Sequence, residues 1–205
     1  MRKTLAAVVV ATIALMAGCI PAYEGNPSGE KVGVLGNSIT SLSKEEIEAA
    51  LRPTHQVSVS GNNGKKLIEM IDVGQEYADS DPDVMVIQFG TNDVGDPAWD
   101  PLWEFLAVAD MAARFTEQRC LYWVNVEEHV NDGWWNERAT AFNGYVEFWR
   151  SEYPNLQPIN WNGVVEYFGR DVMLCPDQVH PSEFGQFVLA AMIQDAATHC
   201  PGYVT

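Results

Sequence analysis

Four polar residues, far apart in the chain, carry side chains that together could perform acyl transfer. Ser38 and Asn92 each follow a short apolar run, and Asp177 and His180 lie three residues apart near the carboxyl terminus. A hydroxyl, an imidazole, a carboxylate and a side-chain amide can serve as nucleophile, base, orienting group and oxyanion donor. Each residue alone has a plainer explanation as a turn former or a helix cap. Their occurrence together favours the catalytic interpretation.

The apolar runs alternate with segments of helical periodicity, which predicts an α/β fold with helices on both faces of a parallel sheet. We expect a doubly wound, flavodoxin-like, three-layer α/β/α domain with five parallel strands in the order 2-1-3-4-5. The expected strands span residues 31–35, 56–60, 83–89, 120–126 and 156–161. The expected helices span residues 43–51, 65–79, 101–118, 136–152 and 181–199.

Ligands of such sheets bind beyond the carboxyl ends of the strands. Ser38 follows the first expected strand, the turn Gly61-Asn62-Asn63-Gly64 follows the second, and Asn92 follows the third. Asp177 and His180 come after the fifth strand. The predicted elements therefore bring all of these residues to one edge of the sheet, although nothing in their spacing requires it.

Three motifs of this chain resemble those of the SGNH hydrolases, also called GDSL lipases and esterases. Gly36-Asn37-Ser38-Ile39 matches the nucleophile block, Gly90-Thr91-Asn92-Asp93 the asparagine block, and Asp177-Gln178-Val179-His180-Pro181 the Asp-x-x-His block. The resemblance extends from Val32 to about the end of the last helix. It departs from the family pattern at Asn37, where the family usually has aspartate, and this raises the question of how the serine turn is held.

The resemblance implies a serine esterase that hydrolyses carboxylic esters through a covalent acyl-enzyme. Ser38 would be the nucleophile, His180 the general base, and Asp177 the residue that orients the imidazole. The oxyanion hole would consist of the Ser38 amide, the Gly64 amide and the Asn92 side chain, with Gly61 as the alternative to Gly64. No cofactor and no metal ion is needed for this mechanism.

Four tryptophans, Trp99, Trp103, Trp134 and Trp135, lie in segments that follow the third and fourth expected strands. They could form a rim around the site that stacks on sugars or covers acyl chains, or they could simply pack helices on the sheet. A carbohydrate O-acetyl ester is the first expectation for the substrate, and a short acyl ester is the second. The alternative from another functional class is a catalytically silent domain of this fold that binds cell-envelope glycan or a partner.

The amino terminus has the pattern of an export signal. Residues 1–18 combine a basic start with an apolar run too short to span a bilayer, and small residues precede Cys19 as in a bacterial lipoprotein box. We expect a signal peptide over 1–18, a lipid-anchored or flexible tether over 19–30, and the hydrolase domain over 31–205. The protein would then be a cell-envelope lipoprotein attached to the membrane only through the lipid on Cys19, or a secreted protein cleaved nearby.

The charge balance excludes one class of partner. The sequence has 28 acidic against 12 basic residues, a net charge of −16. Such a surface repels phosphate backbones, so nucleic-acid binding is not expected. Nothing in the sequence indicates an oligomer, and a monomer is the default.

An exported domain can keep a disulfide. Cys120 opens an expected strand and Cys200 closes the last helix, at the edge opposite the candidate site, which favours a bridge between them and leaves Cys175 as the odd thiol. Cys175 as a nucleophile is a weaker hypothesis, because the expected oxyanion donors surround a serine.

Three remaining histidines have plain interpretations. Glu127-Glu128-His129 could ligate a metal, but three adjacent residues rarely converge on one ion, and a solvated loop is the better interpretation. His55 and His199 are expected at the surface.

Overall fold

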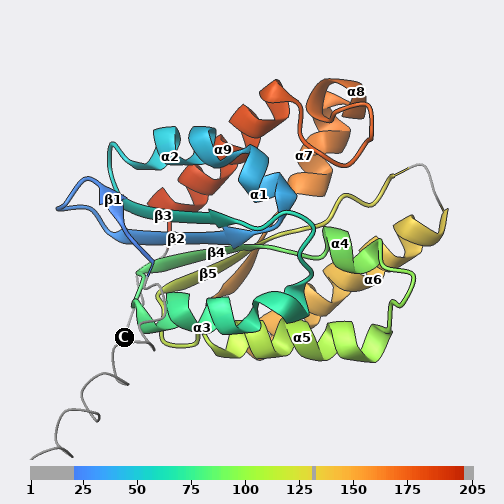
Figure 1. Ribbon diagram of the computed structural model, residues 1–205, viewed down its shortest axis with the longest axis horizontal. Helices are drawn as coiled ribbons and strands as arrows, with labels where there is room; N and C mark the ends of the chain where they lie inside the picture. Colours follow the sequence, from blue (N-terminus) through green and yellow to red (C-terminus); the bar gives the residue numbers. More distant parts are fainter. Residues whose placement is uncertain (1–20, 131–132, 201–205) are drawn as a thin grey trace, which may run out of the picture.

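The computed structural model describes residues 21–130 and 133–200, which form one sheet between two layers of helices (Figure 1). Within these residues the sheet has six strands in the order β1-β3-β2-β4-β5-β6, and only the β1–β3 pair is antiparallel. The strands are β1 (Glu24–Gly25), β2 (Lys31–Gly36), β3 (Gln56–Gly61), β4 (Val84–Gln88), β5 (Cys120–Val124) and β6 (Leu156–Ile159). The α/β class and the mainly parallel sheet are thus confirmed.

Helices cover both faces of this sheet (Figure 1). One layer contains α1 (Ser38–Leu42), α2 (Lys44–Leu51), α7 (Trp161–Phe168), α8 (Arg170–Met173) and α9 (Glu183–Thr198). The other contains the 3₁₀ helix η1 (Leu67–Met70), α3 (Ile71–Asp79), α4 (Thr91–Val94), α5 (Pro101–Ala113) and α6 (Gly133–Arg150).

Two apolar cores follow from the alternation of side chains along each strand. Val84 and Val86 of β4 point into the core shared with α2 and α9, whereas Met85 and Ile87 point into the core shared with α5 and α6. All four are fully buried, and each such side chain stabilises the fold by about 1.5–3 kcal/mol relative to exposure. A strand covered on both faces must be apolar throughout, which is why 83–89 is the clearest strand in the sequence.

The predicted strand set and order, five strands as 2-1-3-4-5, do not match the sheet. The sixth strand, β1, precedes all the expected strands and pairs antiparallel with β3 through Glu24↔Val57 and Gly25↔Gln56. It lies in the segment 19–30 that we expected to be a tether. Without β1, the outer edge of β3 would expose unpaired backbone groups, and pairing removes part of that cost. The other five strands follow one another as β3-β2-β4-β5-β6.

The segment after β6 also differs from expectation. The strand expected over 156–161 ends at Ile159, because Asn160 caps a new helix by accepting a hydrogen bond from Gly163 N at 3.1 Å. That helix, α7, and the short α8 were not expected. Gly169 joins them with φ +92°, a conformation that suits glycine.

His55 is a third correction, because it is buried rather than at the surface. Only 6% of its surface is exposed, and its Nδ1 lies 2.8 Å from Thr54 Oγ1. The turn after α2 folds under β1, whose following residue Asn26 donates its N–H to the His55 carbonyl at 3.0 Å. The strand that was missed is therefore also what covers this histidine. His199, in contrast, has 73% of its side chain exposed.

The Cys120–Cys200 disulfide is confirmed, with the two Cα atoms 6.0 Å apart. It joins the first residue of β5 to the end of α9, so it lies at the amino ends of the strands. Cys175 is not in a disulfide, and its thiol donates to the Pro181 carbonyl at 3.4 Å. The expected signal peptide and Cys19 lie outside the described residues and remain predictions.

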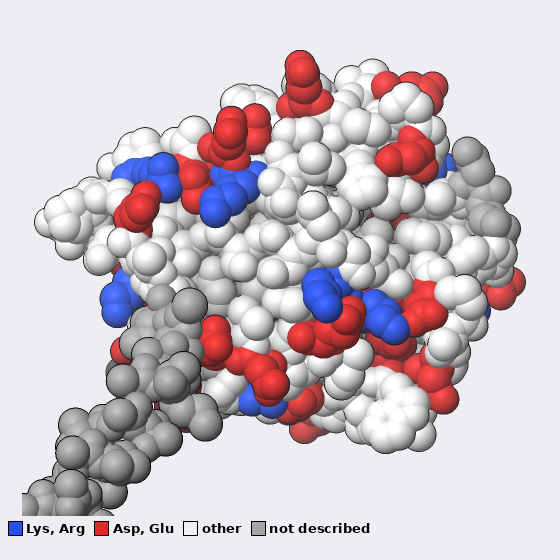
Figure 2. Space-filling model, in the orientation of Figure 1, with Lys and Arg blue, Asp and Glu red and all other residues white. Residues whose placement is uncertain are grey.

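Basic side chains are few on the face of the molecule shown in Figure 2, and most of them adjoin acidic ones. The excess of acidic over basic residues is the basis for the prediction that the protein does not bind nucleic acid. No helix among residues 21–130 and 133–200 is long and apolar enough to cross a membrane.

Candidate active site

Ser38 lies directly beyond the carboxyl end of β2, at the first position of α1. The fully buried Asn37 caps this helix, since its Oδ1 accepts the Ile39 N–H at 3.0 Å. The Asn37 N–H in turn donates to the Gln88 carbonyl at 3.2 Å, which ties the turn to β4. Asparagine thus supplies the same acceptor that an aspartate would, and this answers the question raised by the departure at position 37. The Ser38 N–H belongs to the first helical turn, where amides have no intrahelical partner.

His180 reaches Ser38 across 142 positions of sequence. Its Nε2 lies 2.9 Å from Ser38 Oγ, and its Nδ1 lies 2.8 Å from Asp177 Oδ2. Both distances are those of hydrogen bonds. The structure therefore brings the hydroxyl, the imidazole and the carboxylate into one chain of contacts.

A tight loop between α8 and α9 holds His180 and Asp177. The other carboxylate oxygen of Asp177, Oδ1, accepts the N–H groups of Val179 and His180, each at 3.0 Å. The Cys175 N–H donates to the His180 carbonyl at 2.7 Å, and Gln178 adopts φ +60° to close the turn. Backbone hydrogen bonds thus hold the Asp177 carboxylate in place independently of its contact with the His180 ring.

Asp177 stays ionised because of these bonds. Partial burial acts most strongly and raises its pKa, but the backbone and ring hydrogen bonds from His180, with that from Val179, outweigh burial and lower the pKa below its ordinary value. An ionised carboxylate at Nδ1 keeps the proton on that nitrogen and leaves Nε2 as an acceptor for the Ser38 hydroxyl.

Asn92 lies on α4, just beyond the carboxyl end of β4, and points its amide toward the loop that follows β3. One Nδ2–H donates to the Lys65 carbonyl at 2.9 Å, which leaves the second N–H for another acceptor. The sharp turn before it requires Gly90, at φ +119°, because a Cβ there would lie 2.5 Å from Phe142 and Val126.

The two glycine candidates have different surroundings. Gly64 has φ +71° and open space where a Cβ would be, and its N–H donates to no atom of the described residues. Gly61 is the last residue of β3, and a Cβ there would lie 2.3 Å from the Ser41 backbone. These surroundings describe the Cβ side of each glycine, and both stay candidates for the oxyanion amide.

A buried carboxylate, Asp93, joins the two loops that carry Asn92 and Gly64. Its Oδ1 accepts the Leu67 N–H at 2.8 Å and its Oδ2 accepts the Gly90 N–H at 3.0 Å. The Lys66–Asp96 ion pair, at 2.5 Å, links the same loops nearer the surface. In the sequence Asp93 was only the last residue of the asparagine block, and its positioning contacts were not predicted.

Glu104 of α5 is a site residue that the sequence analysis missed. Burial, and then the charge of Asp93, raise its pKa to about 7. Burial likewise raises the pKa of Asp93 to about 6, against the lowering effect of its backbone hydrogen bonds. The signal was present in the sequence, because Glu104 precedes the buried Ala107, Val108 and Met111 at helical spacing and so interrupts an apolar stripe.

The expected tryptophan rim is only partly exposed. Trp99 stacks on Tyr145 with ring centroids 6.4 Å apart, and both Trp99 and Trp135 pack against the core under α5 and α6. Trp103 and Trp134 are exposed, and the Arg138 guanidinium lies 4.8 Å from the Trp134 ring centre. The role of these rings in substrate binding remains a prediction.

The solvated loop expected at Glu127-Glu128-His129 is wrong for Glu127, because only 5% of its surface is exposed, whereas half of the His129 side chain is exposed. In the described part of the chain, no group of three or more His, Cys, Asp and Glu side chains is arranged to hold an ion. Glu128 instead accepts from Asn143 Nδ2 at 2.7 Å and from Thr140 Oγ1 at 3.0 Å.

Comparisons with known proteins identify the fold. No protein-family model matches the sequence, and no curated protein matches it. Structural neighbours across most of the chain are SGNH/GDSL lipases and esterases, at low sequence identity.

Three of these neighbours illustrate the likeness. A GDSL-like lipase from Bacteroides thetaiotaomicron has a TM-score of 0.69 and 18% identity, over 82% of this chain and 88% of its own. The lipase/acylhydrolase from Enterococcus faecalis has a TM-score of 0.67 and 18% identity, over 86% and 100%. A variant of an acetyl-xylooligosaccharide esterase from Geobacillus has a TM-score of 0.62 and 18% identity, over 83% and 94%.

Proposed function

We propose that this protein is an exported serine esterase that hydrolyses carboxylic esters through a covalent acyl-enzyme. The observation that carries the proposal is the pair of contacts made by His180, 2.9 Å to Ser38 Oγ and 2.8 Å to Asp177 Oδ2. The fold that this chain has in common with SGNH/GDSL lipases and esterases supports the same reaction class.

In the first half of the reaction, Ser38 Oγ attacks the ester carbonyl carbon while His180 Nε2 takes the hydroxyl proton. The carbonyl electron pair moves onto oxygen, where the Ser38 amide, the Gly64 amide and the second Asn92 N–H would receive it. His180 then gives the proton to the leaving alcohol, and the acyl group remains on Ser38.

In the second half, water attacks the acyl-enzyme and transfers its proton to the same nitrogen. Collapse of the tetrahedral intermediate releases the carboxylic acid and returns the proton to Ser38. Asp177 stays ionised throughout and stabilises the imidazolium.

The substrate we propose is an O-acetylated carbohydrate, with a short acyl ester as the second choice. The likeness to an acetyl-xylooligosaccharide esterase supports the first choice, and so does an extracytoplasmic site if residues 1–18 act as a signal. Export through that signal and lipid on Cys19 belong to the same proposal. A mature protein that partitions wholly into the aqueous phase of a detergent extraction would exclude the lipid.

Covalent labelling tests the proposal against a catalytically silent domain. A fluorophosphonate should label the wild-type protein on Ser38, and Ser38→Ala should abolish both labelling and hydrolysis of 4-nitrophenyl acetate, a loss of at least about 10⁴-fold. Ser41→Ala is the matched control, since Ser41 lies on the same helix and contacts neither Asp177 nor His180 in the described residues. An unlabelled wild-type protein that turns over no ester would establish the silent domain.

A further inference from the structure

Beside the loop that holds His180 lies a pocket of about 690 Å³ with no role in the mechanism above. Its polar lining consists of His129 and Glu166, Arg170 and Asp171, and Gln178. Gln178 stands between Asp177 and His180 in the sequence, so this pocket is contiguous with the catalytic loop.

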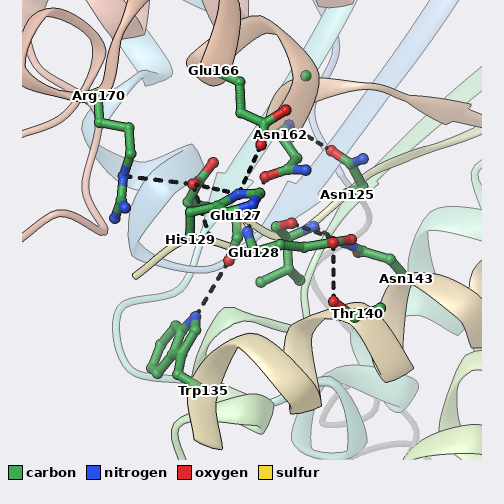
Figure 3. Close-up of polar contacts among 12 residues, drawn as sticks. Asn125, Glu127, Glu128, His129, Trp135, Thr140, Asn143, Asn162, Glu166 and Arg170 are labelled. Atoms are coloured by element: carbon green, nitrogen blue, oxygen red, sulfur yellow. Dashed lines mark hydrogen bonds and ion pairs between the residues drawn. The ribbon is translucent and has the colours of Figure 1, made fainter. Parts of the chain in front are cut away.

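The residues of this pocket are held by a buried carboxylate, Glu127, with only 5% of its surface exposed. Its Oε1 accepts the His129 N–H at 3.1 Å and lies 3.7 Å from Arg170 Nε. His129 Nδ1 in turn lies 2.9 Å from Glu166 Oε1 (Figure 3). Glu127 therefore holds the backbone of His129 and lies beside the Arg170 guanidinium.

The loop that carries these residues is fastened on both sides (Figure 3). Asn125 Oδ1 accepts the Asn162 N–H of α7 at 2.8 Å. Asn143 of α6 binds the Val126 N–H at 2.8 Å and the Val126 carbonyl at 2.9 Å. Fixed polar side chains lose little entropy when they bind a ligand, which is the property of a preorganised site.

The charge arrangement does not serve stability well. Arg170 Nε and Nη2 and Glu127 Oε2 are buried and hydrogen bond to no atom of the described residues. A buried ion pair at 3.7 Å that leaves donors and an acceptor unmatched costs more than an apolar pair of the same size. Stability alone therefore does not account for this cluster.

We propose that this pocket is a subsite for a neutral, hydroxyl-rich sugar ring next to the ring that carries the ester. Sugar hydroxyls donate and accept at once, and the pocket offers donors on Arg170 and Gln178 and acceptors on Glu166 and Asp171. The carboxylates of Glu127, Glu166 and Asp171 outnumber the one guanidinium, so an anionic sugar is disfavoured. The position of the ester in this inference rests on the proposed esterase function, whereas the binding of the neighbouring sugar ring does not.

Kinetics on two substrates tests the subsite. Arg170→Met should lower kcat/KM for an acetylated xylo-oligosaccharide about 10- to 100-fold more than for 4-nitrophenyl acetate, which is too small to fill the pocket. Glu166→Gln, an isosteric change at a half-exposed side chain, should shift the same ratio less. It provides a second test of the subsite if the Arg170→Met variant does not fold. Arg150→Met, an exposed arginine on α6, should leave the ratio unchanged. Equal loss on both esters, or no loss on either, would overturn the subsite.

A binding measurement separates this inference from the esterase proposal. Titration calorimetry of Ser38→Ala with acetyl-free xylotetraose should give binding that weakens at least about tenfold when Arg170→Met is added. Sugar binding by a wild-type protein without esterase activity would keep the subsite and refute the esterase. Lack of sugar binding, or tighter binding of a glucuronate-containing oligosaccharide, would reject the neutral-sugar subsite whatever the activity.

Discussion

The proposed catalytic groups come from two regions that are held in different ways. Ser38 begins α1 and His180 lies in the loop before α9, and both helices pack on one face of the sheet. Asn92 and Gly64 adjoin α4 and η1, which pack on the other face. In the first region the reacting side chains hydrogen bond directly to one another. In the second they do not, and the non-reacting Asp93 joins their loops instead.

This difference teaches which residues can be inferred from a mechanism and which cannot. Where reacting groups bind each other, the chemistry itself specifies which contacts must form. Where a donor must wait for a charge that develops only in the transition state, other residues have to hold it. In the oxyanion region that residue is Asp93, which accepts backbone N–H groups of both loops.

The largest effect should come from breaking the first region at Asp177. In Asp177→Asn the amide no longer imposes an Nδ1–H tautomer on His180, so kcat for 4-nitrophenyl acetate should fall about 10³- to 10⁴-fold with little change in fold. Steady-state kinetics and circular dichroism on the purified variant measure both quantities. Asp195→Asn is the matched control. Asp195 pairs with His199 at 3.0 Å, but within the described residues no serine hydrogen bonds to that histidine. A loss below tenfold would contradict the orienting role.

An intermediate effect should follow from removing the donor of the second region. Asn92→Ala should lower kcat about 100-fold and leave KM within about twofold, because the oxyanion exists only in the transition state. The neighbouring Asn63→Ala, an exposed residue of the Gly64 loop, should change neither constant. A rise in KM with kcat unchanged would assign Asn92 to ground-state binding instead.

The smallest effect should appear in stability, through Glu104. Its folded pKa of about 7 lies above the ordinary value of 4.5, so the native state binds more protons between these pH values. The free energy of unfolding therefore falls as pH rises through this window, by roughly 1–2 kcal/mol from Glu104 after allowance for partial exposure. Glu104→Gln should make that fall smaller and leave only the part due to Asp93, as urea unfolding at pH 5 and pH 8 would measure. The exposed Glu117→Gln should retain it, and an identical pH profile in wild type and Glu104→Gln would refute the buried-carboxyl explanation.

Motif residues could be named from the sequence because their identities are fixed by chemistry. Ser38 and Asn92 each follow a strand whose apolar run was clear, whereas Asp177 and His180 were identified from their motif, after two helices that were not expected. The Cys120–Cys200 bridge could be predicted for the same reason, since both ends of well-defined elements fell at the opposite edge. Local pattern and sheet topology sufficed for these positions.

Other features had no local signal strong enough to read. β1 has two residues, too few for a period, and exists because the edge of β3 accepts it. The burial of His55 follows from that same pairing. The predicted strand was extended past Ile159 because no residue near Pro158 marks the end of a strand. In the structure the strand ends there because Asn160 caps α7.

The sequence by itself determined the reacting groups and the order of the elements that carry them, because side-chain chemistry and hydrophobic period are properties of short segments. Only the tertiary structure decided the distances between those groups, the partnership of Asp93 with Glu104, and the convergence of Arg170, Glu127 and His129 beside the catalytic loop. Such contacts join residues from different elements, and burial and charge at each of them depend on what the rest of the chain packs around it.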